Sequence, residues 1–307
     1  MTQASAGLSA PRETGLVWAA ILPHGPEVVP EVAADPALMA ETRSAMEEAG
    51  RRFAAARPDT VILLDPLLAH NQNLFEQRLL FRGEGTLPVG VAARASGRMG
   101  RASEEFECDL ELAQAILAAG RAAGLPVVAE PGEKGKLPLV GGALIPLWFT
   151  VRPLAPPRPR LVMIAPSPGV PREELVRFGR LLAEVAAASG ERVALIASAD
   201  HGHTHDANHA RFGYSPAAAQ YDALYCEAVS AGRLERLLTV SDELLIGSWA
   251  DSLWQTLILA GALQVVPMPV DLLSYAVPSY YGMVVAVYSP PCGSPEGGVP
   301  ATPRAKG

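Results

Sequence analysis

Cysteine is scarce in this chain. Its three cysteines, Cys108, Cys226 and Cys292, lie far apart, and none belongs to a CxxC motif. A disulfide framework and a thiolate zinc site both need closely or regularly spaced cysteines, so we predict neither. The first fourteen residues also lack the apolar stretch of a secretory signal. Together these absences predict a protein of the reducing cytoplasm.

Basic charge and long hydrophobic runs are lacking as well. Lys and Arg number 25 against 32 Asp and Glu, which gives a formal net charge of −7. Without a dense basic run, the chain has no electrostatic footprint for nucleic acid or for an anionic membrane surface. Its most apolar long stretch, residues 253–273, is interrupted by polar residues and two prolines, which is too broken for a bilayer span of roughly 20 residues. We therefore expect neither nucleic acid nor a membrane as a partner.

What is present is an alternation of short apolar runs and amphipathic stretches over most of the 307 residues. Strands are predicted at 15–22, 61–64, 127–129, 160–165, 192–199 and 283–288. Helices are predicted at 36–57, at 103–117 with Ser103 as its cap, and at 175–185, 217–231 and 252–262. The pattern indicates the α/β class: a single three-layer domain in which helices flank a central mixed, largely parallel sheet. We expect this domain to cover 15–289, between a flexible N-terminus at 1–14 and a flexible Pro/Gly-rich tail at 290–307.

Histidine is rare but unevenly placed. Four of the six histidines lie within nine residues, in the segment DHGHTHDANH that follows the strand at 192–199. Alternate residues of an extended segment point the same way, so His201, His203 and His205 could converge on a metal ion. The alternative interpretation is a solvated polar loop without a function.

Three further residues are candidates because of where they lie. His24 follows the strand at 15–22, and His70 follows the strand at 61–64 by a few residues. Asp251 opens the apolar helix DSLWQTLILAGAL. In open α/β sheets, sites assemble at the carboxyl ends of the strands. The alternatives are a turn residue for His24 and a helix cap for Asp251.

Five segments together resemble the class III extradiol ring-cleavage dioxygenases. They are LPHGP, IASADHGH, FGYSPAAAQYD, ADSLWQTLILAGAL and VPSYYGMVVAVY, and the resemblance spans residues 17–288. This superfamily includes the catalytic subunit of protocatechuate 4,5-dioxygenase and the Memo-like proteins. The resemblance implies a nonheme Fe(II) enzyme that opens a catechol-like or aminophenol-like ring with both atoms of O2. It also implies a homo-oligomer or a partner subunit in a heteromeric dioxygenase.

The resemblance also implies roles for individual residues. His24 matches the first iron ligand, Asp251 lies where the carboxylate ligand is expected, and His203 matches the general acid/base, with His201 as a second catalytic candidate. Two histidines and one carboxylate leave Fe(II) positively charged, with open positions for substrate and O2. A histidine that titrates near neutrality can take up the substrate proton and return it.

Two departures from the family pattern keep other functions open. Leu67 stands where the second histidine ligand is expected, so His70 replaces it only if the loop shifts by three residues, and Val140-Gly141-Gly142 replaces a polar segment before the next apolar strand. A noncatalytic binding protein of the same fold, Memo-like or subunit-like, is therefore the alternative. A binuclear metallohydrolase ranks third: the run His203-Thr204-His205-Asp206 resembles the HxHxD motif of these enzymes, but Ala207 stands where the adjoining histidine is expected.

Overall fold

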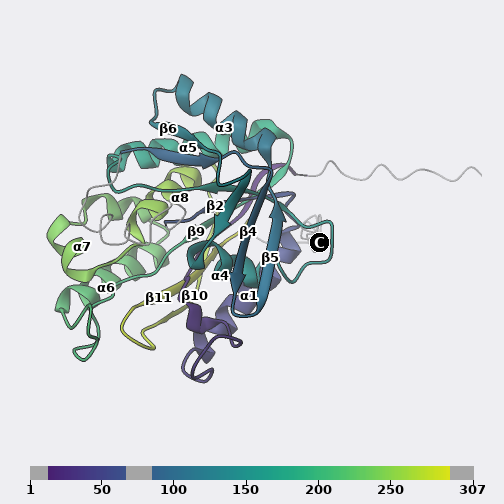
Figure 1. The fold of residues 1–307 in the computed structure, drawn as a ribbon. Helices are drawn as coiled ribbons and strands as arrows, with labels where there is room; N and C mark the ends of the chain where they lie inside the picture. The colour runs from purple at the N-terminus through teal and green to yellow at the C-terminus, as the bar shows by residue number, and fades with distance from the viewer. Residues whose placement is uncertain (1–12, 67–84, 291–307) are drawn as a thin grey trace, which may run out of the picture.

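The structure is a computed structural model that describes residues 13–66 and 85–290. Its centre is an eight-stranded sheet in the order β10-β11-β1-β9-β2-β8-β3-β6 (Figure 1). The strands are β1 Gly15–Leu22, β2 Thr60–Leu64, β3 Leu87–Gly90, β6 Val127–Glu130, β8 Arg160–Ile164, β9 Arg192–Ser198, β10 Val270–Ala276 and β11 Met283–Tyr288. A second sheet has the order β5-β4-β7, with β4 Arg94–Met99, β5 Ala102–Glu107 and β7 Lys136–Leu139.

The middle of the large sheet is parallel. Strand β9 pairs in parallel with β1 and with β2, and β2 pairs in parallel with β8, whereas β11 runs antiparallel to β1. Every residue of β1 and β2 is buried, as expected for strands covered on both faces. This arrangement confirms the predicted α/β class with a mixed sheet.

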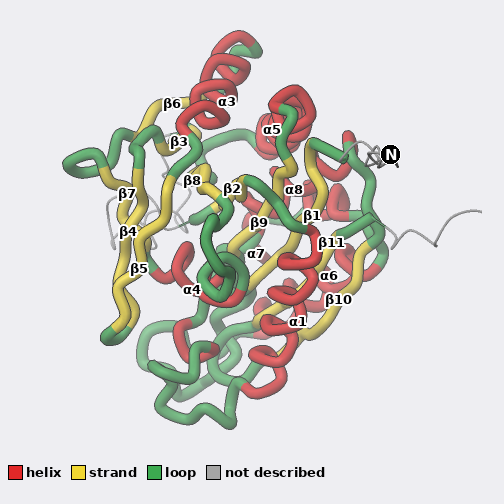
Figure 2. The backbone as a smooth tube through the Cα atoms, turned by 90° about the vertical axis from the view of Figure 1, so that its right-hand side faces the viewer, coloured by secondary structure: helices red, strands yellow, loops and turns green. Residues whose placement is uncertain are grey.

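Helices cover both faces of the large sheet and complete the three layers. They are α1 Ala40–Ala56, α3 Leu110–Ala122, α4 Gly141–Phe149, α5 Arg172–Ser189, α6 Pro216–Ser230, α7 Asp242–Ser248 and α8 Leu253–Val265, with short 3-10 helices at Pro26–Val28 and Leu234–Thr239. Residues of α3, α5 and α8 share one hydrophobic core, and residues of α1, α4 and the small sheet share the other. In Figure 2, α1 and α4 lie in front of the large sheet and α8 lies behind it. The predicted helices at 36–57, 175–185, 217–231 and 252–262 are thus confirmed as α1, α5, α6 and α8.

Two local predictions were wrong. The segment after Ser103 is strand β5, which pairs antiparallel with β4, and the helix begins only at Leu110, where Asp109 is the cap and its Oδ1 accepts a hydrogen bond of 2.9 Å from the amide of Leu112. The apolar stretch after Gly141 is helix α4 rather than a strand. In both places the local pattern fitted two structures, and pairing or packing with distant residues decided between them.

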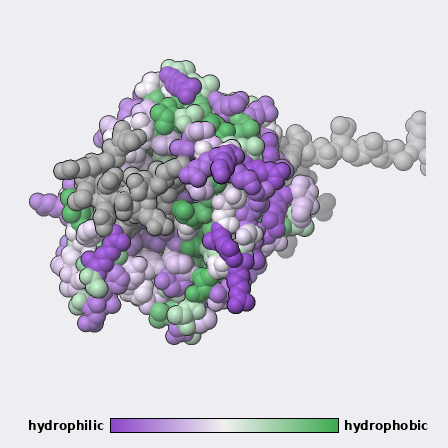
Figure 3. Space-filling view, in the orientation of Figure 1, coloured by the Kyte–Doolittle hydropathy of each residue, from purple (hydrophilic) through white to green (hydrophobic). Residues whose placement is uncertain are grey.

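The surface agrees with the acidic, charged composition. Hydrophilic residues cover much of the face seen in Figure 3, including the region over β4 and β5. There, Glu105 forms ion pairs with Arg94 and with Lys136. Within 13–66 and 85–290, no helix is both long enough and apolar enough to cross a bilayer.

Strands β1, β2 and β9 are parallel, so their carboxyl ends meet at one edge of the large sheet. The segments that leave this edge begin at Pro23, Asp65 and Ala199. His70 and Leu67 lie outside the described residues. Residues 1–12 and 291–307 also lie outside them, so the structure does not test most of the flexible ends predicted at 1–14 and 290–307. The carboxyl edge is therefore built here from His24, the segment after β9 and the elements that pack against them.

Candidate active site

His24 is held at the carboxyl end of β1 by two side chains. Its backbone N–H donates to Oδ1 of Asp200 over 2.9 Å, and its ring Nδ1 lies 2.9 Å from Oγ of Ser198. The hydroxyl of Ser198 donates its own proton to the carbonyl of Gly142, so Oγ accepts from Nδ1–H of the imidazole. The ring is thereby oriented with Nε2 directed away from Ser198 and toward the edge of the sheet.

Two carboxylates meet this nitrogen. Nε2 of His24 lies 3.3 Å from Oδ2 of Asp251 and 3.4 Å from Oδ2 of Asp200. All three residues are at most 6% exposed. Both distances exceed the usual N–H···O range of about 2.7–3.2 Å, so they are close charged contacts rather than well-formed hydrogen bonds. The structure thus brings His24 and Asp251 together, as predicted, and adds Asp200.

Asp251 does not cap the helix that follows it. Helix α8 begins at Leu253 with Ser252 as its cap residue, and Oδ1 of Asp251 instead accepts a hydrogen bond of 2.9 Å from the backbone N–H of Asp200. Its Oδ2 is buried and has no hydrogen-bond partner within the described parts of the chain. The position of this carboxylate is therefore explained by the His24 cluster and not by helix capping.

The charges of this cluster depend on one another. Burial by itself lowers the pKa of His24, but the nearby carboxylates of Asp200 and Asp251 outweigh it and raise the pKa to about 9. Burial raises the pKa of Asp200 to about 6, opposed by His24. Burial also acts to raise the pKa of Asp251, but His24, His203 and the amide of Asp200 together outweigh it, so this pKa is lowered. Without a bound cation, the cluster thus holds a proton on His24 at neutral pH.

His203 lies beside this cluster on the segment that follows β9. It is 5% exposed, its backbone N–H donates to the carbonyl of Ser248 over 2.7 Å, and its ring is parallel to that of Tyr281 with 5.3 Å between centroids. Burial lowers the pKa of His203 to about 4, although Asp251 opposes this shift. The expected titration near neutrality is not found: with this pKa, His203 is neutral at pH 7, because its ring is buried.

The other two histidines that were predicted to converge, His201 and His205, do not join His203. His201 is fully buried against Tyr225, and neither of its ring nitrogens has a hydrogen-bond partner among the residues described. Burial lowers its pKa to about 4. Nε2 of His205 donates to Oδ2 of Asp222 over 2.9 Å. The expected convergence of three histidines is therefore wrong, since each ring packs against a different neighbour.

Asp222, on α6, is a residue that sequence reasoning missed. It is fully buried and accepts hydrogen bonds from the amide of Gly202, from His205 and from the hydroxyl of Tyr275. It therefore ties the histidine segment to α6 and β10. The motif FGYSPAAAQYD contained this aspartate, but nothing in the motif revealed that its partner was a histidine seventeen residues earlier.

Aromatic rings from two segments of the chain lie near His203. Tyr280 stacks on His209 with 3.9 Å between centroids and on Phe212 with 5.4 Å, and Phe212 lies 5.3 Å from the ring of His203. Tyr281 also donates its hydroxyl to Oε2 of Glu27 over 2.8 Å. These rings, from two separate segments of the chain, form an apolar wall next to the cluster.

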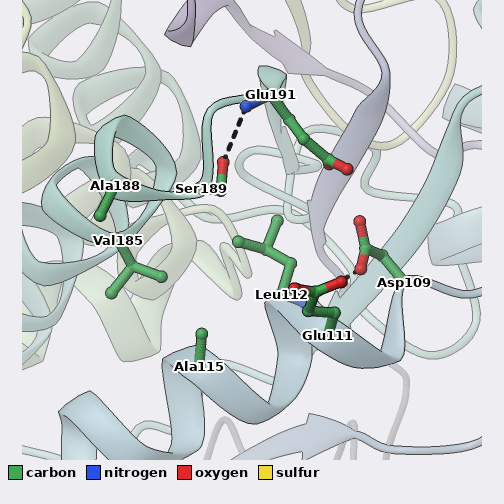
Figure 4. Close-up of a pocket in the computed structure, with 8 residues that line it drawn as sticks. All are labelled: Asp109, Glu111, Leu112, Ala115, Val185, Ala188, Ser189 and Glu191. Atoms are coloured by element: carbon green, nitrogen blue, oxygen red, sulfur yellow. Dashed lines mark hydrogen bonds between the residues drawn. The ribbon is translucent and has the colours of Figure 1, made fainter.

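A cavity of about 340 Å³ lies at the opposite edge of the sheet, between α3 and α5 (Figure 4). It is lined by Asp109, Glu111, Leu112, Ala115, Val185, Ala188, Ser189 and Glu191. Its buried carboxylate, Asp109, is paired with Arg160, whose Nη2 lies 3.0 Å from Oδ2. Because this carboxylate already has a cationic partner, the cavity does not share the chemistry of the His24 cluster.

Comparisons with known proteins identify the family and the fold. Residues 18–286 match the family model of the catalytic LigB subunit of aromatic ring-opening dioxygenase. No curated protein sequence matches the chain. Among solved structures, an uncharacterized protein of Escherichia coli K12, JW3007, is similar over 88% of this chain and 99% of its own, with a TM-score of 0.55 and 14% identity, which shows a shared fold.

The matched region contains every described strand of the large sheet except the ends of β1 and β11, and it contains His24, His203 and Asp251. The predicted superfamily is thus confirmed over most of the chain. The chain belongs to the LigB family, named for the catalytic subunit of aromatic ring-opening dioxygenases.

Proposed function

We propose that this chain is an Fe(II)-dependent extradiol dioxygenase that opens a catechol-like or aminophenol-like ring with O2. The observation that carries this proposal is the buried cluster in which Nε2 of His24 faces Oδ2 of Asp251, beside a neutral His203. The family match to a ring-opening dioxygenase subunit supports the same reaction class. We also propose a cytoplasmic protein that works as a homo-oligomer or with a partner subunit.

The residues present fit a divalent metal. Ser198 occupies Nδ1 of His24, which leaves Nε2 as the nitrogen available to a metal. Asp251 directs toward that nitrogen a buried oxygen that has no hydrogen-bond partner within residues 13–66 and 85–290. An imidazole and a carboxylate are ligands that suit Fe(II). His70, outside the described residues, remains our proposed second nitrogen ligand.

A bound Fe(II) would supply the positive charge and the open positions that hold a catecholate and O2. The protein residues would act on the substrate around it. We expect Nε2 or Nδ1 of the neutral His203 to accept the proton of a substrate hydroxyl and to return it to the ring-opened product. Tyr281 would hold the His203 ring by stacking, and its own hydroxyl is held by Glu27.

The aromatic wall of Phe212, Tyr280 and Tyr281 supports an aromatic substrate. Flat apolar rings pack against one another in offset or edge-to-face arrangements, which stabilises a bound ring by about 0.5–1.5 kcal/mol per pair. The same wall limits the access of water to His203. We therefore expect a planar aromatic substrate that binds with one face toward these rings.

The direct test is turnover after anaerobic loading with Fe(II). The purified chain would be mixed with catechol, protocatechuate or 2-aminophenol and O2, while O2 consumption and the absorbance of the ring-opened product are followed. We expect equal amounts of O2 consumed and ring opened. An iron-loaded protein that binds these compounds without consuming O2 would instead support the noncatalytic binding protein.

The described geometry gives no support to the binuclear metallohydrolase. His203 and His205 pack against different neighbours, and in the parts of the chain that are described no group of three or more His, Cys, Asp or Glu side chains has the geometry of a complete metal site. Metal analysis separates the candidates: about one iron per chain supports the dioxygenase, and two zinc ions per chain support the hydrolase.

A further inference from the structure

We propose that Asp222 is a positioning residue for His203, because its carboxylate binds the chain on both sides of that histidine. The inference deepens the proposed function and rests on it, since the position of His203 matters for catalysis only if this residue carries the substrate proton. It also assigns a role to His205, which links the chain after His203 to the carboxylate.

The carboxylate of Asp222 is fully buried and has three hydrogen-bond donors. Oδ1 accepts a bond of 2.8 Å from the amide of Gly202, and Oδ2 accepts bonds of 2.9 Å from Nε2 of His205 and from the hydroxyl of Tyr275. Gly202 directly precedes His203, and His205 follows it by two residues. One side chain of α6 therefore holds the chain before and after His203.

Backbone hydrogen bonds hold the histidine segment, residues 200–205, between two other parts of the chain. The carbonyl of Gly202 accepts a bond of 3.0 Å from the amide of Gly282, and the amide of His203 donates to the carbonyl of Ser248 over 2.7 Å. Within the described regions, the amide of Gly202 has no backbone acceptor, and the carboxylate on α6 takes that place. The carboxylate thus completes the hydrogen bonding of the segment next to the proposed acid/base.

The packing around this carboxylate is tight. A Cβ atom added to Gly282 would lie 2.2 Å from Oδ2 of Asp222, and one added to Gly202 would lie 2.7 Å from Cα of Ala218 on α6. Both positions therefore need glycine, because any side chain would force the backbone away from α6. The carboxylate consequently holds the histidine segment at one fixed distance from this helix.

The bonds made by Asp222 are also stronger than ordinary backbone bonds. An ionised carboxylate only accepts, so Nε2 of His205 carries the proton of their shared bond. Hydrogen bonds to an ionised group are roughly twice as strong as those between neutral groups. Among the described residues, His205 is the ion-pair partner of Asp222, and no lysine or arginine competes for its oxygens. The charge of the carboxylate is therefore directed at the segment that presents His203.

The ring of His203 depends on this placement. It lies parallel to the ring of Tyr281 with 5.3 Å between centroids, and the backbone of the histidine segment sets where the imidazole stands against that ring. A displacement of about 1 Å at a catalytic group can lower a rate by as much as 10²-fold. Loss of the bond to Asp222 should therefore lower the rate of proton transfer rather than substrate binding.

The test removes one link and then restores it. His205→Leu removes the donor to Asp222, whereas His205→Gln places an amide N–H where Nε2 stands. In His205→Leu we expect kcat for catechol to fall by about 10–100-fold, with KM and iron content within about twofold of the wild type. In His205→Gln we expect kcat to recover to within about threefold of the wild type. An unchanged kcat in His205→Leu would overturn the inference.

Tyr275→Phe is the matched control. It removes another donor to the same oxygen of Asp222, but Tyr275 lies on β10 and not on the histidine segment. Its kcat should equal that of the wild type. If Tyr275→Phe lowered kcat as much as His205→Leu does, Asp222 would act through general stability, and the positioning role would be wrong.

A second measurement needs neither iron nor turnover. In metal-free protein with isotope-labelled histidine, the ring-proton resonances of His203, assigned with His203→Gln, report where the ring lies against Tyr281. We expect them to move in His205→Leu and to keep their wild-type positions in His205→Gln and in Tyr275→Phe. If His205→Leu does not fold, His205→Ala takes its place in both measurements, with the same expected results.

The possible failures are distinguishable. If the wild type opens the ring of catechol but neither kcat nor the His203 resonances change in His205→Leu, the positioning role is wrong and the proposed dioxygenase stands. If the iron-loaded wild type opens no ring but the resonances of His203 move in His205→Leu, the proposed function fails and Asp222 still positions His203.

Discussion

Buried aspartates lie at both edges of the large sheet, but their surroundings differ. At the amino edge, Asp109 contacts the guanidinium of Arg160, the hydroxyl of Thr60 and the first turn of α3. At the carboxyl edge, Asp200 and Asp251 share one histidine, and Oδ2 of Asp251 has no hydrogen-bond partner in the described regions.

The difference separates a structural charge from one that we propose to be functional. A carboxylate that is paired with arginine and also caps a helix stabilises the fold and needs no further ligand. Two carboxylates that face one titratable ring retain affinity for a cation, because their charge is not fully compensated. Burial of a carboxylate alone therefore does not indicate a binding site. Burial of more carboxylates than cationic partners does.

The largest expected effect is that of His24→Ala on metal binding. The substitution removes the one nitrogen that both carboxylates face, so Fe(II) binding should weaken by more than about 100-fold. The metal-free variant should also unfold more easily at neutral pH than the metal-free wild type, since two buried carboxylates lose their partner. Metal content after anaerobic loading and thermal unfolding check these results. Full iron occupancy in the variant would show that His24 is not a metal ligand, and the proposed difference between the two edges would then be wrong.

The next effect concerns proton transfer. His203→Gln should leave iron bound while turnover of a catechol falls by about 10²-fold or more, the scale of a lost general acid/base. His209→Gln is the matched control, because His209 stacks on Tyr280 beside the same site and is not proposed to carry the proton. Loss of iron from His203→Gln would instead make His203 a ligand.

The metal-free protein should lose stability as the pH rises. The pKa of His24 is about 9 in the folded protein against 6.5 as its ordinary value, so its contribution is complete below pH 6.5 and is lost as the pH rises through 9. A shift of this size corresponds to about 3 kcal/mol of unfolding free energy. Urea unfolding between pH 6 and 10 measures it. A stability that rises over this interval would show that His24 is not charged in the fold.

At the amino edge, the effect should be confined to stability. Asp109→Asn keeps a good helix cap but loses the charge that faces Arg160, which we expect to cost about 1–3 kcal/mol of unfolding free energy. Metal affinity should not change. A change in metal affinity in this variant would mean that the two edges are coupled.

The smallest effect is expected at the two described cysteines. Burial raises the pKa of Cys108 and of Cys226 to about 12, so both thiols are protonated at neutral pH. Labelling of the folded protein with a thiol reagent at pH 8 should be slow at both positions. Fast labelling at either one would show that the segment around it opens readily.

Much of the fold was predictable because it depends on local patterns. The apolar runs of β1 and β2 predicted strands buried on both faces. The spacing of apolar residues in α5 predicted a helix with one apolar face. The errors at Ser103 and after Gly141 arose where distant partners decided the structure. Ser103 followed by two glutamates is a pattern typical of a helix start. The segment nevertheless forms strand β5, because it pairs with β4.

The site was predictable only in part. His24 and Asp251 were found because each stands at the end or start of an apolar element, and the structure places them 3.3 Å apart. The sequence predicted only that Asp200 follows the end of a strand. Nothing in the neighbouring residues indicated that its carboxylate would turn toward His24 at the end of β1. The role of His70 stays a prediction. A residue's place in the chain indicates which edge it occupies, but the direction of its side chain depends on contacts with distant segments.

The cluster is assembled from remote parts of the chain, because 176 residues separate His24 from Asp200 and another 51 separate Asp200 from Asp251. Contacts of such long range form late in folding, after the entropy of closing large loops has been overcome. During synthesis, a nascent chain therefore lacks this binding centre until residue 251 has left the ribosome and the last strands have paired. If the cluster binds the proposed metal, early fragments of the protein cannot capture it, because they lack part of the site.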